Sequence, residues 1–389
     1  MELGKHIKKK PSDFVVEEVP SIDISSSGRY PVYLLKKSGL STLQVVRFLS
    51  YRYRIKPSDI GFAGLKDKVA ITTQYLTFPP DVSIPERECF KHHSGKWLKQ
   101  DRLNYEQETG FCIEKVGYTE GKLQLGQIKG NLFRIKIHSL GKELRRRFYE
   151  NLQQVELYGC PNYFGEQRFG SIKGTNDFIF LHILKGEFEK ALKIYFSIKG
   201  DIKNWGNWEA FYRDFRGKVE QYERDLILGL KRGLSFEKAF RILPKNIRLM
   251  FNFAFQSYMW NEYLRRYIET KYPFIRVPFM GKWRLSFYTD VDDIGYLKNM
   301  EIPYTGREFP PEDKLLKKII DDTIRELGIG EDAFGKEVGG IKLLTDGLRK
   351  AVFIPENLRV VSKTKNSITL SFFLPAGSYA TVLIRRLLI

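Results

Sequence analysis

The 389-residue sequence predicts an α+β fold in which a β-rich domain is interrupted by a mainly helical insertion. Strand-like patterns fill the first part of the chain, helical patterns dominate from Gly159 to about Leu327, and strand patterns return near Ala351. Apolar residues make up 42% of the chain, which is ample for a buried core. We therefore expect the last strands to complete the sheet begun by the first.

The N-terminal elements follow from apolar alternation and from the residues that stop it. Residues 14–19 form a strand pattern that ends at Pro20, and residues 30–35 form another. Ser41 or Thr42 can cap a helix that runs to Tyr51. A Thr-rich apolar strand pattern then spans 69–78 and is stopped by two prolines.

The rest of the chain divides in the same way. A second β section is expected at 111–138, followed by a helix at 142–157. The clearest helices of the middle region are expected at 178–198, 222–232, 247–268 and 312–327, and the final strands at 351–361, 367–374 and 378–388.

The charge balance favours an anionic partner. Lys and Arg number 65 against 46 acidic residues, a formal net charge of +19. A thermally adapted surface explains many charges but not a one-sided excess, because ion-pair networks need both signs. Nucleic acid is therefore the favoured partner. No segment is apolar enough to span a bilayer and no secretory signal is visible, so we expect no membrane association and a cytoplasmic location.

The cysteines and histidines predict chemistry without a metal. Cys89, Cys112 and Cys160 are scattered and odd in number, which predicts neither a disulfide framework nor a cysteine zinc site. His92 and His93 lie in a polar stretch that reads as a solvated loop. Residues 328–333 fit the dinucleotide pattern GxGxxA by letter. A helix precedes them and their acidic residues repel phosphate, so they predict a helix end and loop.

The segment 64–68, Gly-Leu-Lys-Asp-Lys, is a charged turn between apolar stretches, and by itself it reads as a solvated hairpin turn. Several separate stretches around it, however, together resemble the TruD family of pseudouridine synthases. The matching motifs occur in family order at 11–18, 62–74, 125–133, 161–170, 256–261 and 374–381.

The resemblance implies a pseudouridine synthase catalytic domain with a mixed, mostly antiparallel sheet, formed by residues 1–158 and 346–389. A mainly helical TRUD insertion domain would occupy 159–345. The implied activity is isomerisation of uridine to pseudouridine in tRNA, at position 13, with no metal and no organic cofactor. The sequence does not fix the oligomeric state, for which a monomer is the default expectation.

By resemblance, Asp67 is the essential carboxylate. It could add to uracil C6, attack C1′, or take the 2′ proton, and the sequence leaves these routes open. A pocket that excludes water disfavours an ionised carboxylate, and a nearby cation offsets this. The resemblance points to Lys8 as that cation, although it stands in the run Lys8-Lys9-Lys10, where a solvated charge is the simpler interpretation.

Two further residues of the implied site lie in the second β section. Phe133 would stack on the flipped uracil, and Asn131 would hold the catalytic loop or the target nucleotide. Without the resemblance, Phe133 reads as a core residue of an alternating strand and Asn131 as a turn residue.

The 161–170 motif supplies the remaining candidates. Its aromatic, amide and guanidinium side chains could receive bases beside the target. It could equally shape the hinge between the two domains. The RNA-binding candidates of this motif are Asn162, Phe164, Gln167, Arg168 and Phe169, and the basic runs 145–147, 265–266 and 317–318 are candidates for phosphate contact.

Few residues between 274 and 337 match the family pattern, so substrate choice is the least defined property. The rival function is a basic RNA-binding or RNA-chaperone module that uses the same cleft without catalysis. An intact set of Asp67, Asn131 and Phe133 argues against it, because a binding module needs no buried carboxylate facing phosphates.

Overall fold

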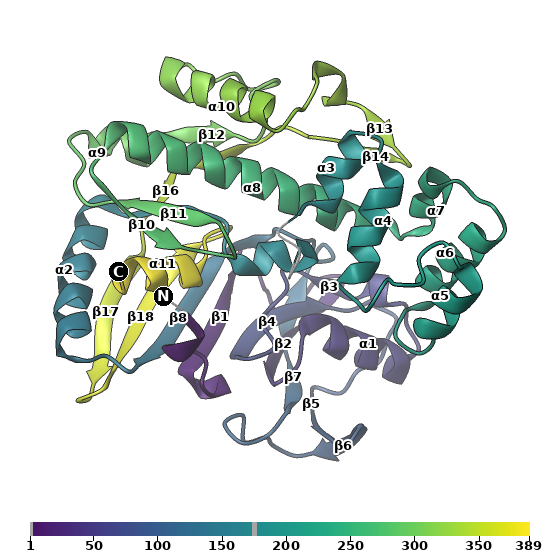
Figure 1. Ribbon diagram of the computed structural model, residues 1–389. Coiled ribbons are helices and arrows are strands. Elements are labelled where there is room, and N and C mark those ends of the chain that lie inside the picture. Colours follow the sequence, from purple (N-terminus) through teal and green to yellow (C-terminus); the bar gives the residue numbers. More distant parts are fainter. Residues whose placement is uncertain (1–2, 173–176) are drawn as a thin grey trace. The chain divides into compact units, whose positions relative to one another are not determined.

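The computed structural model describes residues 3–172 and 177–389, which form two compact units (Figure 1). Unit 1 comprises residues 1–160 and 353–389, and unit 2 comprises residues 161–352. The chain thus leaves unit 1 once and returns to it once. The boundaries expected from sequence, after residues 158 and 345, lie near these limits, and the status of unit 2 as an inserted domain stays a prediction.

A 10-stranded sheet forms the body of unit 1, in the order β17-β18-β8-β1-β4-β2-β7-β5-β6, with β3 paired to β4. Strands β1 and β4 run parallel, whereas the other paired neighbours are antiparallel. This confirms the mixed, mostly antiparallel sheet. The strands are β1 Phe14–Pro20, β2 Tyr30–Ser38, β3 Gly61–Phe62, β4 Ile71–Thr77, β5 Arg87–His93, β6 Lys96–Gln100, β7 Gly110–Thr119, β8 Ile128–His138, β17 Glu356–Lys363 and β18 Ser367–Pro375.

Segments from the two ends of the sequence meet in this sheet, as expected. Strand β18 pairs with β8, so that Phe372 lies opposite Phe133, and β8 pairs in turn with β1, so that Phe133 lies opposite Val16. In Figure 1 the yellow strands β17 and β18 stand beside β8, which stands beside the purple β1.

One face of the sheet is buried, and the other is only partly exposed. Along the strands, residues that point to the buried face alternate with residues that point to the other face. Exposed charged residues on that other face include Glu17, Lys36 and Arg134. Helix α1 (Thr42–Tyr53) packs on the buried face, where its residues Val45 and Leu49 are fully buried in a core shared with β2, β4, β5 and β7. Its predicted cap is confirmed, since Ser41 accepts a hydrogen bond from the Gln44 amide.

Helices α2 (Lys142–Tyr158) and α11 (Ala380–Leu387) pack together in unit 1. Arg386 donates to the Asn151 side chain at 2.6 Å. The expected strand at 378–388 is therefore wrong. Nearly all residues of α11 are buried, including Arg385 and Arg386. Its start, Thr381 to Ile384, is a short β-branched and aliphatic run, and such a run does not distinguish a buried helix from a buried strand.

Strands β5 and β6 were not expected from sequence, and two further expectations fail there. Cys89 of β5 lies opposite Cys112 of β7, and the two form a disulfide, contrary to the prediction from their spacing. Scattered positions gave no signal because the pair is brought together by strand pairing across a separation of 23 residues. His92 and His93 belong to β5 rather than to a loop.

Unit 2 is mainly helical and is built on the long helix α8. Its helices are α3 Ile179–Leu184, α4 Phe188–Ser197, α5 Trp208–Asp214, α6 Gln221–Lys231, α7 Phe236–Ile242, α8 Lys245–Lys271, α9 Ile294–Asn299 and α10 Lys314–Glu326. The short strands are β10 Phe274–Pro278, β11 Arg284–Tyr288, β12 Glu301–Pro303, β13 Glu337–Val338, β14 Ile341–Lys342 and β15 Leu348–Lys350; β9 Cys160–Pro161 and β16 Val352–Phe353 lie at the unit boundaries.

Two glycines with positive φ determine where helices end in unit 2. The helix expected at 178–198 is two helices, because Gly186 between α3 and α4 takes a φ of 74°. Gly328 ends α10 with a φ of 66°, so the GxGxxA stretch begins at a helix end, as expected, but its last three residues form a short 3-10 helix rather than a loop. Short 3-10 helices occur at Leu3–Lys5, Pro11–Asp13, Pro57–Asp59, Glu166–Ile172 and Glu331–Ala333. Within the described ranges, none of the helices combines the length and apolar character that crossing a bilayer requires.

Candidate active site

The loop between β3 and β4 carries Asp67 over the buried face of the sheet in unit 1. The Asp67 carboxylate accepts a hydrogen bond from Lys8 Nζ at 2.5 Å. The two side chains are 28% and 25% exposed, so the ion pair is shielded but open to a ligand on one side. Charge-assisted bonds of this kind are roughly twice as strong as neutral ones.

Lys8 is singled out from its lysine run by backbone conformation. Its φ is 59°, in the left-handed region that a residue with a Cβ occupies at a cost of about 1–2 kcal/mol. Lys9 instead reaches Ser139, and Lys10 lies 3.9 Å from Glu106. Strained backbone of this type clusters at functional sites.

Lys8 also connects Asp67 to the aromatic side chains of the sheet. Its ammonium lies 4.3 Å from the centre of the Phe14 ring, a cation–π distance. Phe14 meets Phe133 edge-on at 6.1 Å, and Phe133 stacks on Phe372 at 5.4 Å. The structure therefore brings Asp67, Lys8 and Phe133 into one continuous set of contacts, with Phe14 as the link.

The backbone of the Asp67 loop is held by side chains from α1 and β4. The Lys66 amide donates to Thr42 Oγ1 at 3.0 Å, and Thr42 donates to Gln74 Oε1 at 2.8 Å. Gln74 in turn donates to the Gly64 carbonyl at 3.0 Å. Buried polar groups joined in this way rigidify the segment that they hold.

A buried ion pair fixes the residue before Asp67. Lys66 Nζ lies 2.5 Å from Glu18 Oε2, and their side chains are 7% and 0% exposed. Glu18 also accepts from the Tyr75 amide at 3.2 Å, which joins β1 to β4. Removing one member of such a pair would leave an uncompensated buried charge.

A second buried lysine reaches the same loop from β2. Lys37 is fully buried, and its ammonium donates to the carbonyls of Leu40 at 2.7 Å, Asp67 at 2.8 Å and Lys66 at 3.5 Å. Burial is the main cause that lowers the pKa of Lys37 to about 7; the Asp67 charge opposes this fall and the Lys66 charge adds to it.

The predicted substrate residues of β8 lie beside this cluster. Asn131 is opposite Glu18 on β1, and its buried Oδ1 has no hydrogen-bond partner in the part of the chain that the structure describes. Phe133 is 9% exposed, so most of its ring surface is already covered by Phe14 and Phe372. An unsatisfied buried acceptor calls for an explanation such as a ligand donor.

Three of the five candidates in the 161–170 motif lie in the interior of unit 2. Asn162 is buried and bonds Arg349 and the Lys350 carbonyl. The backbone of Phe164 is bonded through both its N–H and C=O to the Asn261 side chain of α8. These contacts give the residues a clear structural role.

Phe169 is likewise fully buried, edge-on to Phe279 and Trp283. Gln167 is exposed, and Arg168 is half-buried, donating to Ser257 Oγ at 3.1 Å with its guanidinium over the Phe253 ring. Within the motif, Gln167 and Arg168 are thus the candidates that present side chains to solvent.

The basic runs are largely engaged with carboxylates or carbonyls. Arg146 pairs with Glu143 and Glu150, and Lys318 pairs with Asp322. Arg265 is bound by Glu262 and Glu269. Paired cations make weaker phosphate ligands, because an ion pair must be broken first.

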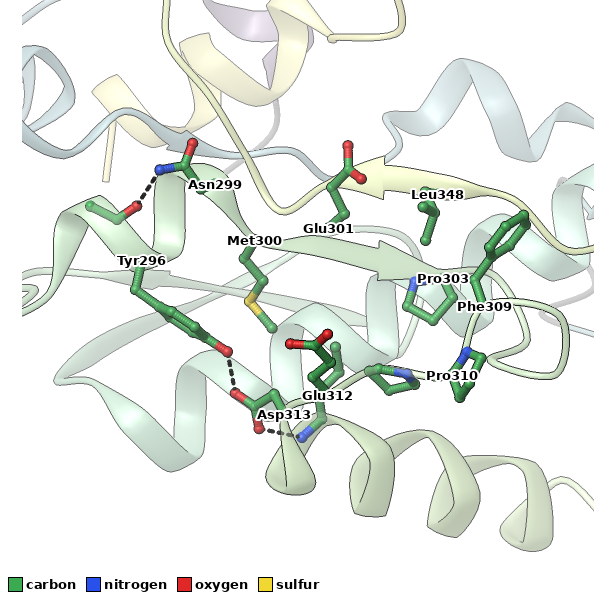
Figure 2. A pocket seen from close by; sticks show the side chains of 13 residues that line it. Tyr296, Asn299, Met300, Glu301, Pro303, Phe309, Pro310, Glu312, Asp313 and Leu348 are labelled. Carbon is green, nitrogen blue, oxygen red and sulfur yellow. Dashed lines mark hydrogen bonds between the residues drawn. The ribbon is translucent and has the colours of Figure 1, made fainter.

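A hollow of about 740 Å³ in unit 2 is lined by α9, β12 and the start of α10 (Figure 2). Asp313 accepts from the Tyr296 hydroxyl at 2.8 Å and from the Leu316 amide at 3.0 Å, so its carboxylate caps α10. Glu301 and Glu312 also line the hollow and make it unfavourable for a phosphate.

No group of three or more His, Cys, Asp or Glu side chains is placed to hold a metal ion within residues 3–172 and 177–389. The Asp67 cluster is instead made of two carboxylates, Asp67 and Glu18, each paired with a lysine, together with aromatic rings. Such a set can position an ionised carboxylate beside a stacked planar ring.

Sequence reasoning missed Phe14, Glu18, Lys37 and Thr42 as members of this cluster. A signal for two of them was present. Glu18 and Lys37 occupy inward-facing positions of alternating strands, where the neighbouring inward residues are apolar. A charged residue at such a position is rarely buried without a specific partner.

Comparison with known proteins identifies the family of the chain. The family model described as tRNA pseudouridine synthase D (TruD) matches residues 1–278 and 298–387. A tRNA pseudouridine synthase D of Aquifex aeolicus (strain VF5) is 40% identical over 390 residues, covering 98% of this chain and 97% of that protein. A relative from Methanocaldococcus jannaschii, whose description also names tRNA pseudouridine synthase D, is 30% identical and covers 98% of this chain and 90% of its own length.

A solved structure extends the likeness to the fold. The crystal structure of a Methanosarcina mazei protein described under the TruD name aligns with a TM-score of 0.65 at 23% identity, covering 98% of this chain and 93% of that chain. The chain belongs to the TruD family of tRNA pseudouridine synthases.

Proposed function

We propose that this protein isomerises uridine to pseudouridine in tRNA, with Asp67 as the catalytic carboxylate. The observation that carries the proposal is the Asp67–Lys8 pair, which is held over the sheet and joined through Phe14 to Phe133. Family membership supports the same reaction.

The reaction requires the target uridine to leave its stack before Asp67 can reach it. Lys8 pairs the carboxylate with a positive charge and so holds it in place in a shielded site. An ionised carboxylate serves each of the three routes, namely addition at C6, attack at C1′ and removal of the 2′ proton.

The roles of the neighbouring residues are part of the proposal. Phe133 would contact the extruded uracil with the remaining open part of its ring. The free Oδ1 of Asn131 could accept the N3–H of that uracil, which is a donor that cytosine lacks. In unit 2, Gln167 and Arg168 would contact RNA, whereas Asn162, Phe164 and Phe169 would shape the backbone that presents them.

The finer assignments rest on resemblance. We propose position 13 of tRNA as the target, and action without a metal or organic cofactor. We also propose a monomer in the cytoplasm. The Cys89–Cys112 disulfide is compatible with that location in organisms whose intracellular proteins retain disulfides, as those of hyperthermophiles do.

The decisive test compares wild type with Asp67→Ala and Asp67→Asn on an unmodified tRNA transcript, without metal or added cofactor. Pseudouridine is mapped by carbodiimide labelling and primer extension. Wild type should give one new stop, and both variants should give none while binding tRNA with unchanged affinity. Asp101→Ala, at an exposed aspartate outside the cluster, should match wild type.

The outcomes separate the proposals. A stop at another uridine would keep the enzyme class and move the target. Product from Asp67→Ala equal to wild type would remove Asp67 from the chemistry. Tight binding by wild type with no stop on any RNA would favour the non-catalytic RNA-binding module.

A further inference from the structure

Lys37 is a buried cation with an unusual set of partners. Its side chain lies on the covered face of β2, and in the described part of the chain its ammonium meets backbone carbonyls rather than a carboxylate. The other fully enclosed lysine of the cluster, Lys66, has Glu18 as its counter-charge. Burying an ammonium group that contacts no carboxylate is unfavourable, and an apolar side chain of the same length would avoid that cost.

The carbonyls that Lys37 reaches belong to two separate segments. Leu40 precedes the first turn of α1, and Lys66 and Asp67 belong to the loop that carries the carboxylate. An ammonium has three N–H donors, and only the protonated amine supplies all three. Lys37 thus ties the backbone of Asp67 itself to the end of β2.

The other anchors of the loop act on residues before Asp67. Thr42 holds the Lys66 amide, Gln74 holds the Gly64 carbonyl, and Glu18 holds the Lys66 side chain. The carbonyl of Asp67 is bonded by Lys37, and its carboxylate by Lys8. Two cations therefore fix the two ends of the catalytic residue.

We propose that Lys37 is a positioning residue, whose ammonium fixes the backbone of Lys66 and Asp67 so that the Asp67 carboxylate faces Lys8 and the target uridine. The inference rests on the proposed role of Asp67. It predicts that loss of Lys37 slows the chemical step while tRNA binding is retained, because a small displacement of a reacting group can cost about 10²-fold in rate.

The test is single-turnover conversion of saturating, unmodified tRNA by Lys37→Met, which keeps the length of the side chain and removes its donors. We expect a rate constant about 10²-fold below wild type, with a tRNA dissociation constant within about twofold. Lys37→Arg keeps the charge and the donors, and its rate constant should be at least about tenfold higher than that of Lys37→Met. Recovery by the conservative variant distinguishes positioning from volume filling.

A matched control exists in unit 2. Arg248 is 8% exposed and donates to the carbonyls of Leu243 at 2.8 Å and Gly339 at 2.6 Å, so it is also a buried cation on backbone acceptors. Arg248→Met should lower the melting temperature and leave the rate constant of the folded protein unchanged. If Lys37→Met does not fold, Lys37→Gln replaces it, since its shorter amide cannot span both segments.

Wild type and Asp67→Ala are measured in the same assay. Inactive wild type would overturn the proposed function and this inference with it. Active wild type, inactive Asp67→Ala and a wild-type rate in folded Lys37→Met or Lys37→Gln would overturn the role of Lys37 alone.

Discussion

At the scale of single residues, the lysine run Lys8-Lys9-Lys10 illustrates what a sequence can and cannot specify. Three identical side chains carry the same chemistry, so no property of the sequence distinguishes them. The left-handed backbone at Lys8 turns its side chain to Asp67, while its neighbours reach Ser139 and Glu106. The resemblance pointed to Lys8, which is the lysine that contacts Asp67, and its catalytic role stays a prediction.

Replacement of this lysine is the direct test of its electrostatic role. Lys8→Met should lower the single-turnover rate of pseudouridine formation by about 10²-fold, because it removes the charged partner that holds the Asp67 carboxylate in place. Lys9→Met serves as the matched control and should convert tRNA at the wild-type rate. Equal rates for the two variants would contradict a catalytic role for Lys8.

At the scale of elements, long patterns with clear end signals were predicted well. Helix α1 has a capping residue and an apolar face, and β1 has alternation that ends at Pro20. Element α11 was misread because the aliphatic run before its two arginines is too short to distinguish a helix from a strand. The break between α3 and α4 was missed because one glycine inside a helical pattern, here between Lys185 and Glu187, is a weak signal until its φ is known.

Strand β5 was not predicted because it contains several charged residues, although part of it is buried. Glu88 is 1% exposed and accepts from Arg52 at 2.7 Å, from Lys99 at 2.9 Å and from the Tyr53 hydroxyl. A charged residue inside a strand reads as solvated unless its partners, here from α1 and β6, are known. The same hydrogen bonds make the contact between α1 and β5 sensitive to pH.

Two opposing effects act on the pKa of Glu88. Burial alone would raise it, but the hydrogen bonds from Arg52, Tyr53 and Lys99 outweigh burial and lower it to about 2. A depressed carboxyl pKa stabilises the fold above the unfolded pKa of 4.5, and the contribution is lost as pH falls toward 2. Because Arg52 and Lys99 are partly exposed, we expect a contribution of about 2 kcal/mol.

Urea unfolding of wild type and Glu88→Gln across pH 2–7 measures this contribution. The free energies of unfolding should differ by about 2 kcal/mol at pH 7, and the difference should shrink below pH 4.5. A difference that stayed constant across this range would mean that the carboxylate charge of Glu88 is not what stabilises the contact.

At the scale of the whole molecule, the change from strand to helix patterns and back predicted a β-rich part assembled from both ends of the sequence. The sheet order confirms that assembly, because β18 pairs with β8. The register itself could not be predicted, since each pairing depends on strands far apart in the chain. Without it, the contact of Phe133 with Phe372 could not be foreseen.

The net charge of +19 is also a property of the whole molecule and predicts how tRNA binding depends on salt. Affinity should fall about 10–10³-fold between 50 and 200 mM salt, as phosphate contacts release counterions. Arg168→Met should make the slope of log affinity against log salt shallower, by the amount expected for the loss of about one phosphate contact. Gln167→Ala replaces the neighbouring residue without changing the charge, so it should weaken binding and leave the slope unchanged. A wild-type affinity that does not depend on salt would contradict binding dominated by phosphate contacts.

The position of β18 also has a consequence for biosynthesis. Strand β8 is made before the whole of unit 2, and its neighbour β18 is made after it. While the chain is still attached to the ribosome, β8 therefore has an unpaired edge and Phe133 lacks the ring of Phe372. An exposed strand edge of this kind is prone to wrong pairing, so this stage of synthesis is where a chaperone would be needed.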